Sequence, residues 1–153
     1  EKEEKSFLGK SANIALAYII MVIWTAGVVS FYGWLFATDS WNPFGQFTAF
    51  KHPFLIQLFL SCIAAPLWEE LVFRKFPIDI AKATGKKELM LPIVLFSSII
   101  FGLGHEGVPS LLIQGVGGFI MSCLYIKNGY SYWSSVTLHF LWNFSLLTGA
   151  LSI

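Results

Sequence analysis

The sequence predicts an all-α protein: a polytopic membrane helix bundle of about five transmembrane helices. Hydrophobic residues make up 56% of the 153-residue chain and charged residues 12%, a balance typical of chains that lie in lipid. The charges gather in short polar segments between long uncharged runs. A run of about 20 apolar residues is long enough to cross a hydrocarbon core of about 30 Å as a helix.

We expect one domain, because the chain has the length of a single folding unit. Residues 1–10 are predicted to be a charged, solvated N-terminal lead-in, and residues 11–153 a single membrane-embedded helical domain. The chain starts at Glu1 rather than at a methionine, which allows for a removed N-terminal segment. The formal net charge of +1 and the scattered basic residues give no indication of nucleic-acid binding.

The first helix is predicted within residues 11–38, where no residue is charged. Residues 41–45, with the sequence WNPFG, are turn-rich and aromatic and are expected at the membrane interface. His52, which comes later in the same polar segment, is interpreted as an interfacial residue. The second helix is predicted to begin near Phe54. Its Pro66 would leave the carbonyl of Cys62 without a hydrogen bond and introduce a kink.

The second helix is expected to continue past Pro77 to a turn at Gly85, which is a plausible C-terminal cap. A third helix is predicted over residues 89–104, with Pro92 in its first turn, where proline is tolerated. The two helices then form an antiparallel pair.

A fourth helix is predicted over residues 107–126, and a turn at residues 127–129 leads to a fifth helix over residues 131–153. Within the fourth helix, small residues recur at spacings of three and four, which lets helix backbones approach closely; they are Gly115, Gly118 and Ser122. Both cysteines, Cys62 and Cys123, lie inside apolar runs and are interpreted as buried small hydrophobic residues rather than a disulfide or metal pair.

Lysine positions predict the orientation. Lysines at 2, 5 and 10, at 75, 82, 86 and 87, and at 127 fall on alternate polar segments, and only Lys51 falls on the opposite side. Because cytoplasmic loops carry an excess of lysine and arginine, the N-terminus and the 75–88 turn are predicted to be cytoplasmic.

Two adjacent carboxylates and an arginine come after the uncharged run of residues 53–68. An ionisable group facing hydrocarbon is disfavoured by roughly 2.5 to 3.5 kcal/mol, so such groups face a protein interior or a wet cavity and mark a functional site. On a helix, Glu70 and Arg74 are four apart and can pair. Glu69 is rotated from Glu70 by about 100° and has no such local partner.

Other polar residues are predicted at a similar depth. His105 lies 20 residues after the turn at Gly85 and Glu69 lies 16 before it, or about 30 Å and 24 Å of helix. His139 and Asn143 are four apart and share a helix face. One acid, two histidines and an asparagine from three helices can therefore converge inside the bundle, with Glu70 and Arg74 behind them.

Each of these residues also has a simpler interpretation. Taken singly, His105 is typical of a helix end, and His139 and Asn143 are typical of interhelical hydrogen bonds. Glu106 is interpreted as interfacial, and the zinc-protease sequence His-Glu-x-x-His is absent after His105.

Three motifs occur in order: Glu-Glu-x-x-x-Arg at residues 69–74, Phe-x-x-x-His at 101–105 and His-x-x-x-Asn at 139–143. Together they resemble the CPBP family of intramembrane proteases, which includes the type II CaaX prenyl endopeptidases and the bacterial proteases of bacteriocin self-immunity and protein processing. The resemblance covers residues 53–147, about two thirds of the chain, and extends to Gly118, Tyr125 and Gly129 between the motifs.

The resemblance implies an intramembrane endopeptidase of the glutamate type. Glu69 would be the catalytic acid with His105 as its partner, and His139 and Asn143 would form the oxyanion hole. The supporting pair would be Glu70 and Arg74. A carboxylate that shares a water with a histidine can act as general base and pass the proton to the leaving amine. The expected partners are the lipid bilayer and a membrane-associated protein or peptide substrate, lipidated or not.

Two alternatives remain open at this point. Glu69, His105 and His139 are a chemically sound zinc ligand set, so a zinc-dependent intramembrane metalloprotease is the first, although Asn143 suits an oxyanion better than zinc and the metal-free form, with no cofactor, is favoured. The second is a non-catalytic membrane carrier or assembly partner that uses a buried Glu/His relay.

Overall fold

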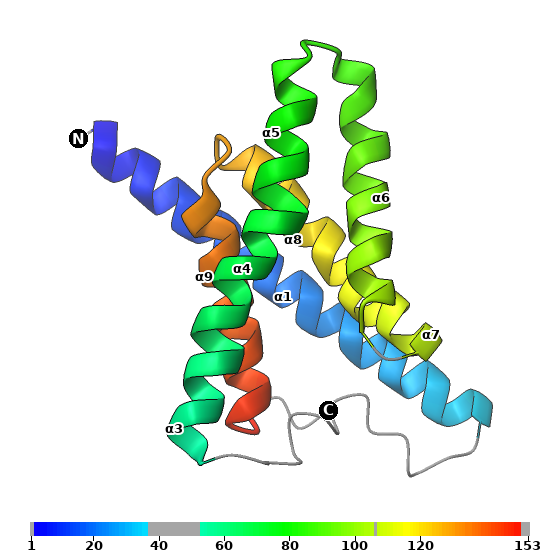
Figure 1. The fold of residues 1–153 in the computed structure, drawn as a ribbon. Helices are drawn as coiled ribbons and strands as arrows, with labels where there is room; N and C mark the ends of the chain where they lie inside the picture. Colours follow the sequence, from blue (N-terminus) through cyan, green and yellow to red (C-terminus); the bar gives the residue numbers. More distant parts are fainter. Residues whose placement is uncertain (1, 37–52, 106, 151–153) are drawn as a thin grey trace.

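The computed structural model of the protein describes residues 2–36, 53–105 and 107–150. Every regular element in these ranges is helical, which confirms the all-α prediction, and the helices pack into one bundle (Figure 1). Two helices of 30 residues, Ser6–Leu35 and Phe54–Ala83, are long and apolar enough to cross a membrane. The interfacial roles predicted for His52 and Glu106 fall outside the described residues.

Helix α1 (Lys2–Phe36) begins inside the charged lead-in, earlier than the predicted start at residue 11. It crosses the bundle obliquely (Figure 1) and packs on α8 and α9 through Ala17 and Met21. Two polar contacts add to this packing. The Tyr18 hydroxyl lies 2.7 Å from the hydroxyl of Ser145, and the Trp24 indole N–H donates to the carbonyl of Leu112 at 2.7 Å.

The second long helix, Phe54–Ala83, is here called helix 2. It consists of α3 (Phe54–Gln57), the π-helical turn η1 (Leu58–Ala64), α4 (Ala65–Glu70), a second π-helical turn η2 (Leu71–Lys75) and α5 (Phe76–Ala83). Each interior proline comes just after a π-helical turn. At η1 the Ala65 N–H donates to the carbonyl of Leu60, five residues earlier. With this longer hydrogen-bond register the helix continues through Pro66, although Pro66 has no N–H to donate.

Helix 2 ends as predicted. Gly85 has a φ of +69°, the left-handed conformation that is common just after a helix C-terminus. After the short 3₁₀ turn η3 (Lys87–Leu89), α6 (Met90–Leu103) returns beside α5 (Figure 1), with Pro92 in its first turn. This antiparallel pair brings the end of α6 back to the depth of α4.

The fourth predicted helix is divided into α7 (Gly107–Ser110), the π-helical turn η4 (Leu111–Gly115) and α8 (Val116–Lys127). The predicted turn comes next, with φ of +72° at Gly129, and α9 (Tyr132–Leu147) runs antiparallel to α8. Asn128 in this turn is buried and joins three segments, because it accepts from Asn13 and donates to Ser134. The turn therefore ties α1 to the α8–α9 pair.

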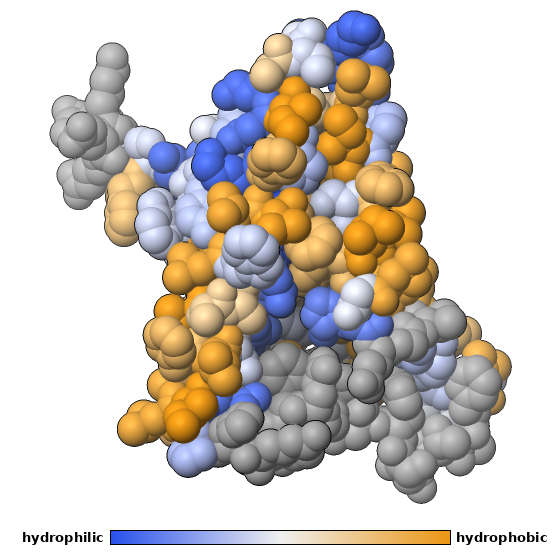
Figure 2. All heavy atoms as spheres, viewed as in Figure 1, coloured by the Kyte–Doolittle hydropathy of each residue, from blue (hydrophilic) through white to orange (hydrophobic). Residues whose placement is uncertain are grey.

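Hydrophobic side chains cover much of the sides of the bundle, and hydrophilic side chains gather at the end that carries the α5–α6 turn (Figure 2). The prediction that both cysteines are buried was right for Cys62 and wrong for Cys123, which is exposed on α8. In a membrane helix, positions facing lipid are as apolar as core positions, so an apolar run alone does not tell the two apart.

The crossing of α6 with η4 depends on two glycines. A Cβ at Gly102 would lie 2.9 Å from the Cα of Gly115, so the backbones are nearly in contact.

We expect Gly102→Ala to destabilise the protein by about 1 to 3 kcal/mol, because the backbones would have to separate. Gly27→Ala in α1, where a Cβ meets nothing within 4 Å, is the matched control and should leave the stability unchanged or raise it. Thermal unfolding of both variants in detergent, monitored by circular dichroism, measures this difference. Equal unfolding temperatures would contradict the close crossing.

Candidate active site

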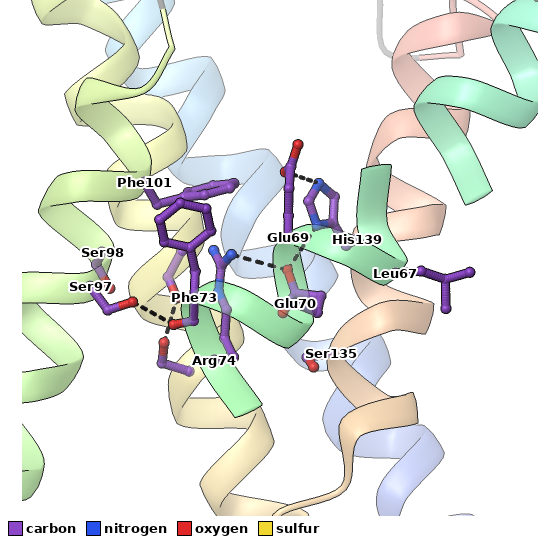
Figure 3. Close-up of polar contacts among 12 residues, drawn as sticks. Leu67, Glu69, Glu70, Phe73, Arg74, Ser97, Ser98, Phe101, Ser135 and His139 are labelled. Atoms are coloured by element: carbon purple, nitrogen blue, oxygen red, sulfur yellow. Dashed lines mark hydrogen bonds and ion pairs between the residues drawn. The ribbon is translucent and has the colours of Figure 1, made fainter. Parts of the chain in front are cut away.

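The predicted ion pair on helix 2 forms in the interior of the bundle. Glu70 and Arg74 are 0% and 1% exposed, and Arg74 Nη1 lies 3.2 Å from Glu70 Oε1. Burying two charges is costly unless each has its partner close by. Figure 3 shows both side chains on the same face of helix 2, beside His139.

The Arg74 guanidinium packs against residues of α6 and α8. The ring of Phe101 lies under the guanidinium carbon at 4.0 Å, in cation–π geometry. A Cβ at Gly118 would come within 2.7 Å of Arg74 Nη2 and 3.1 Å of Phe101 Cδ1. The small-residue pattern of the fourth helix predicted only close helix packing, whereas Gly118 leaves room for a charged side chain.

His139 on α9 lies between the two carboxylates (Figure 3). Its Nδ1 donates to Glu70 Oε1 at 2.8 Å, and its Nε2 lies 3.6 Å from Glu69 Oε2. A carboxylate only accepts hydrogen bonds, so the Nδ1 proton is held by Glu70. Nε2 is then the nitrogen that faces Glu69 and its surroundings. Glu69 itself is 25% exposed, unlike Glu70.

His105 lies beyond the last residue of α6, stacked edge to face on Phe101 with ring centroids 4.8 Å apart. Its Nδ1 donates to the carbonyl of Phe101 at 2.8 Å, because a carbonyl oxygen can only accept. This hydrogen bond sets the ring orientation and leaves Nε2 for other partners. The four-residue spacing of the Phe-x-x-x-His motif therefore has a local structural reason.

Asn143 lies one turn after His139 on α9. Its amide donates to the carbonyl of Ser61 in η1 at 2.7 Å. One of its two N–H groups is thus used to hold α9 against helix 2, and the second N–H remains available.

A cavity of about 210 Å³ brings the predicted residues together; its lining is Gln57, Ser61, Ala65, Glu69, His105, Gln114, His139 and Asn143. Hydrophilic side chains are visible in a hollow between helix 2 and the lower end of α6 (Figure 2). Glu70 and Arg74 do not line the cavity, but Glu70 is hydrogen-bonded to His139, which does. Four lining residues were not predicted. One is Ala65, and the other three are polar residues inside uncharged runs: Gln57, Ser61 and Gln114.

The zinc alternative can be compared with the positions of its three proposed ligands. In the part of the chain that is described, no group of three His, Cys, Asp or Glu side chains is arranged to hold a metal ion. Among the described residues, Glu69, His105 and His139 therefore do not form such a group.

Comparison with known proteins gives two matches. A family model, described as type II CAAX prenyl endopeptidase Rce1-like, matches residues 51–145. A curated protein of Bacillus subtilis (strain 168), named "Putative membrane peptidase YdiL", is 26% identical over 143 residues. That alignment covers 92% of this chain and 57% of the Bacillus protein, so the chain spans little more than half of its relative's length. No solved structure matches significantly.

Proposed function

The chain belongs to the Rce1-like family of type II CAAX prenyl endopeptidases, and from this premise we propose that it is an intramembrane endopeptidase of the glutamate type. The observation that carries the proposal is the single cavity that Glu69, His105, His139 and Asn143 share. A cavity of about 210 Å³ has room for a water and a peptide bond among these side chains.

In this mechanism Glu69 and His105 hold a water, and the Glu69 carboxylate takes one of its protons as the oxygen attacks the scissile carbonyl carbon. The carbonyl π bond breaks and its electron pair becomes the negative charge on oxygen. When that tetrahedral intermediate collapses, the C–N bond breaks and the proton held by Glu69 passes to the leaving amine.

The negative oxygen needs hydrogen-bond donors, which are the free N–H of Asn143 and Nε2–H of His139. Because Glu70 holds the Nδ1 proton, His139 donates from Nε2 only as an imidazolium. Two carboxylates beside the ring stabilise that cation. With Glu69, Glu70, Arg74 and His139 all ionised, the formal charges of the cluster sum to zero (−1, −1, +1, +1), which suits a buried site.

The proposed mechanism uses no metal ion, because a carboxylate and a histidine can activate the water that they share. Proteolysis by the purified protein is expected to be unchanged after overnight dialysis against 1,10-phenanthroline or EDTA. The check is the initial cleavage rate with and without subsequent zinc addition. Loss of activity on chelation together with recovery on zinc addition would favour the metalloprotease alternative with Glu69, His105 and His139 as ligands.

The proposed substrate is a membrane-associated protein, and the family name makes a prenylated protein the first to test. The proposal includes a multi-pass membrane topology with the N-terminus and the 75–88 turn in the cytoplasm, and the lysines at those positions support this orientation. Protein termini in membranes of cells carrying the wild type or Glu69→Gln, compared by mass spectrometry, test the proposal. Termini that disappear with the variant identify the substrate, and identical sets of termini would contradict the function.

A further inference from the structure

Polar residues line helix 2 well beyond the proposed reacting groups. Gln57, Ser61, Ala65 and Glu69 recur at spacings of four residues and all line the cavity. An α-helix has 3.6 residues per turn, so a four-residue spacing drifts around it. The π-helical turn η1 has more residues per turn, which keeps these positions on one line. One line of side chains on helix 2 therefore faces the cavity from Glu69 to Gln57, and three of its four positions are polar.

Gln114 lines the same cavity from η4, away from helix 2. Its carboxamide makes no hydrogen bond to any of the residues that the structure describes. Gln57 donates to the hydroxyl of Ser61 at 3.1 Å, which leaves its second N–H and its carbonyl oxygen free. The proposed mechanism uses neither glutamine.

A peptide that is cut inside a membrane needs hydrogen-bond donors and acceptors for its main chain. The scissile bond must leave helical structure before it can be attacked, and each unsatisfied main-chain N–H or C=O then costs several kcal/mol in an apolar medium. A carboxamide offers both a donor and an acceptor, which is what an extended main chain requires. Glutamine at this depth has no other evident use.

We propose that Gln57 and Gln114 form a substrate subsite that binds the main chain of an extended peptide beside the scissile bond. The proposal rests on the proposed protease function and adds the form in which the substrate is held. Gln57 and Glu69 line the same cavity from positions 12 residues apart on helix 2.

The test uses the purified full chain in detergent with an internally quenched, farnesylated CAAX peptide. Gln114→Leu and Gln57→Leu should each raise KM about tenfold, the effect of one lost hydrogen bond, with little change in kcat. Thr137→Val is the matched control, because Thr137 lies exposed on α9 outside the cavity, and it should change neither constant.

A second series replaces the peptide amides near the scissile bond, one at a time, with N-methyl amides. At the position bound by a glutamine, N-methylation should lower the affinity of the wild type for the peptide. The corresponding Leu variant, which has already lost that hydrogen bond, should bind the methylated and unmethylated peptides equally well. This non-additivity is a readout that a merely structural role would not produce.

The outcomes separate the two proposals. Cleavage that is abolished by Glu69→Gln but has the wild-type KM in both Leu variants would overturn the subsite alone. Cleavage that persists in Glu69→Gln would overturn the protease function and the subsite with it. Additive effects of N-methylation and the Leu substitutions would also reject main-chain binding.

Discussion

Glu69→Gln is expected to lower kcat for peptide cleavage by at least about 10²- to 10⁴-fold, the typical contribution of a general acid–base group. Glutamine keeps the size of the side chain but cannot accept a proton from water at neutral pH. Glu69 is partly exposed to the cavity and has no short hydrogen bond to a described residue, so the fold should tolerate the change. Single-turnover cleavage together with a thermal unfolding curve measures both quantities.

Glu88→Gln provides the control for this prediction. Glu88 is exposed in η3 at the far end of the α5–α6 turn, and its substitution also removes one negative charge. It should leave kcat and stability unchanged. If Glu69→Gln cleaves as fast as Glu88→Gln, then Glu69 is not the base. A Glu69→Gln variant that keeps its full biological effect would favour the carrier or assembly role over catalysis.

Arg74→Met is expected to destabilise the protein by about 3 to 5 kcal/mol, because the buried Glu70 carboxylate loses its guanidinium partner and keeps only His139 beside it. It also removes the cation that packs on Phe101. Cleavage should fall as well, since Glu70 orients His139. Chemical or thermal unfolding in detergent gives the stability, and the cleavage rate is measured at a temperature where the variant is folded.

The same helix contains a second acid–base pair at the same spacing. Lys75 Nζ lies 2.7 Å from Asp79 Oδ2, but the two side chains are 45% and 38% exposed. Lys75→Met is therefore the matched control, and its cost should not exceed about 1 kcal/mol. Similar losses in the two variants would show that burial does not distinguish the pairs. An Arg74→Met variant as stable as the wild type would contradict the buried ion pair.

Most of the helix pattern could be predicted because each signal is local in sequence. Gly85 and Gly129 were assigned to turns and both have positive φ. Helix 2 begins at Phe54 as expected. The start of α1 was placed too late, because the helix continues through Gly9 into the charged lead-in, which has no proline to end it.

The π-helical turns could not be predicted, and they affect the site. Counting residues at 3.6 per turn assigns each side chain a direction, but every added residue in a turn rotates the remainder of the helix by about 100°. In helix 2 this aligns Gln57 and Ser61 with Glu69, and in η4 it places Gln114 at the cavity. A polar residue in an uncharged run is the signal that would have found all three.

The sequence by itself determined the membrane helix class, the pairing of Glu70 with Arg74 and the depth at which the polar residues meet. These depend on composition, spacing and rise along a helix, which are one-dimensional quantities. Only the tertiary structure decided which atoms face each other: His139 between two carboxylates, Asn143 on the Ser61 carbonyl, and Gly118 against Arg74. Those contacts depend on the rotation of each helix about its axis, and packing between helices sets that rotation.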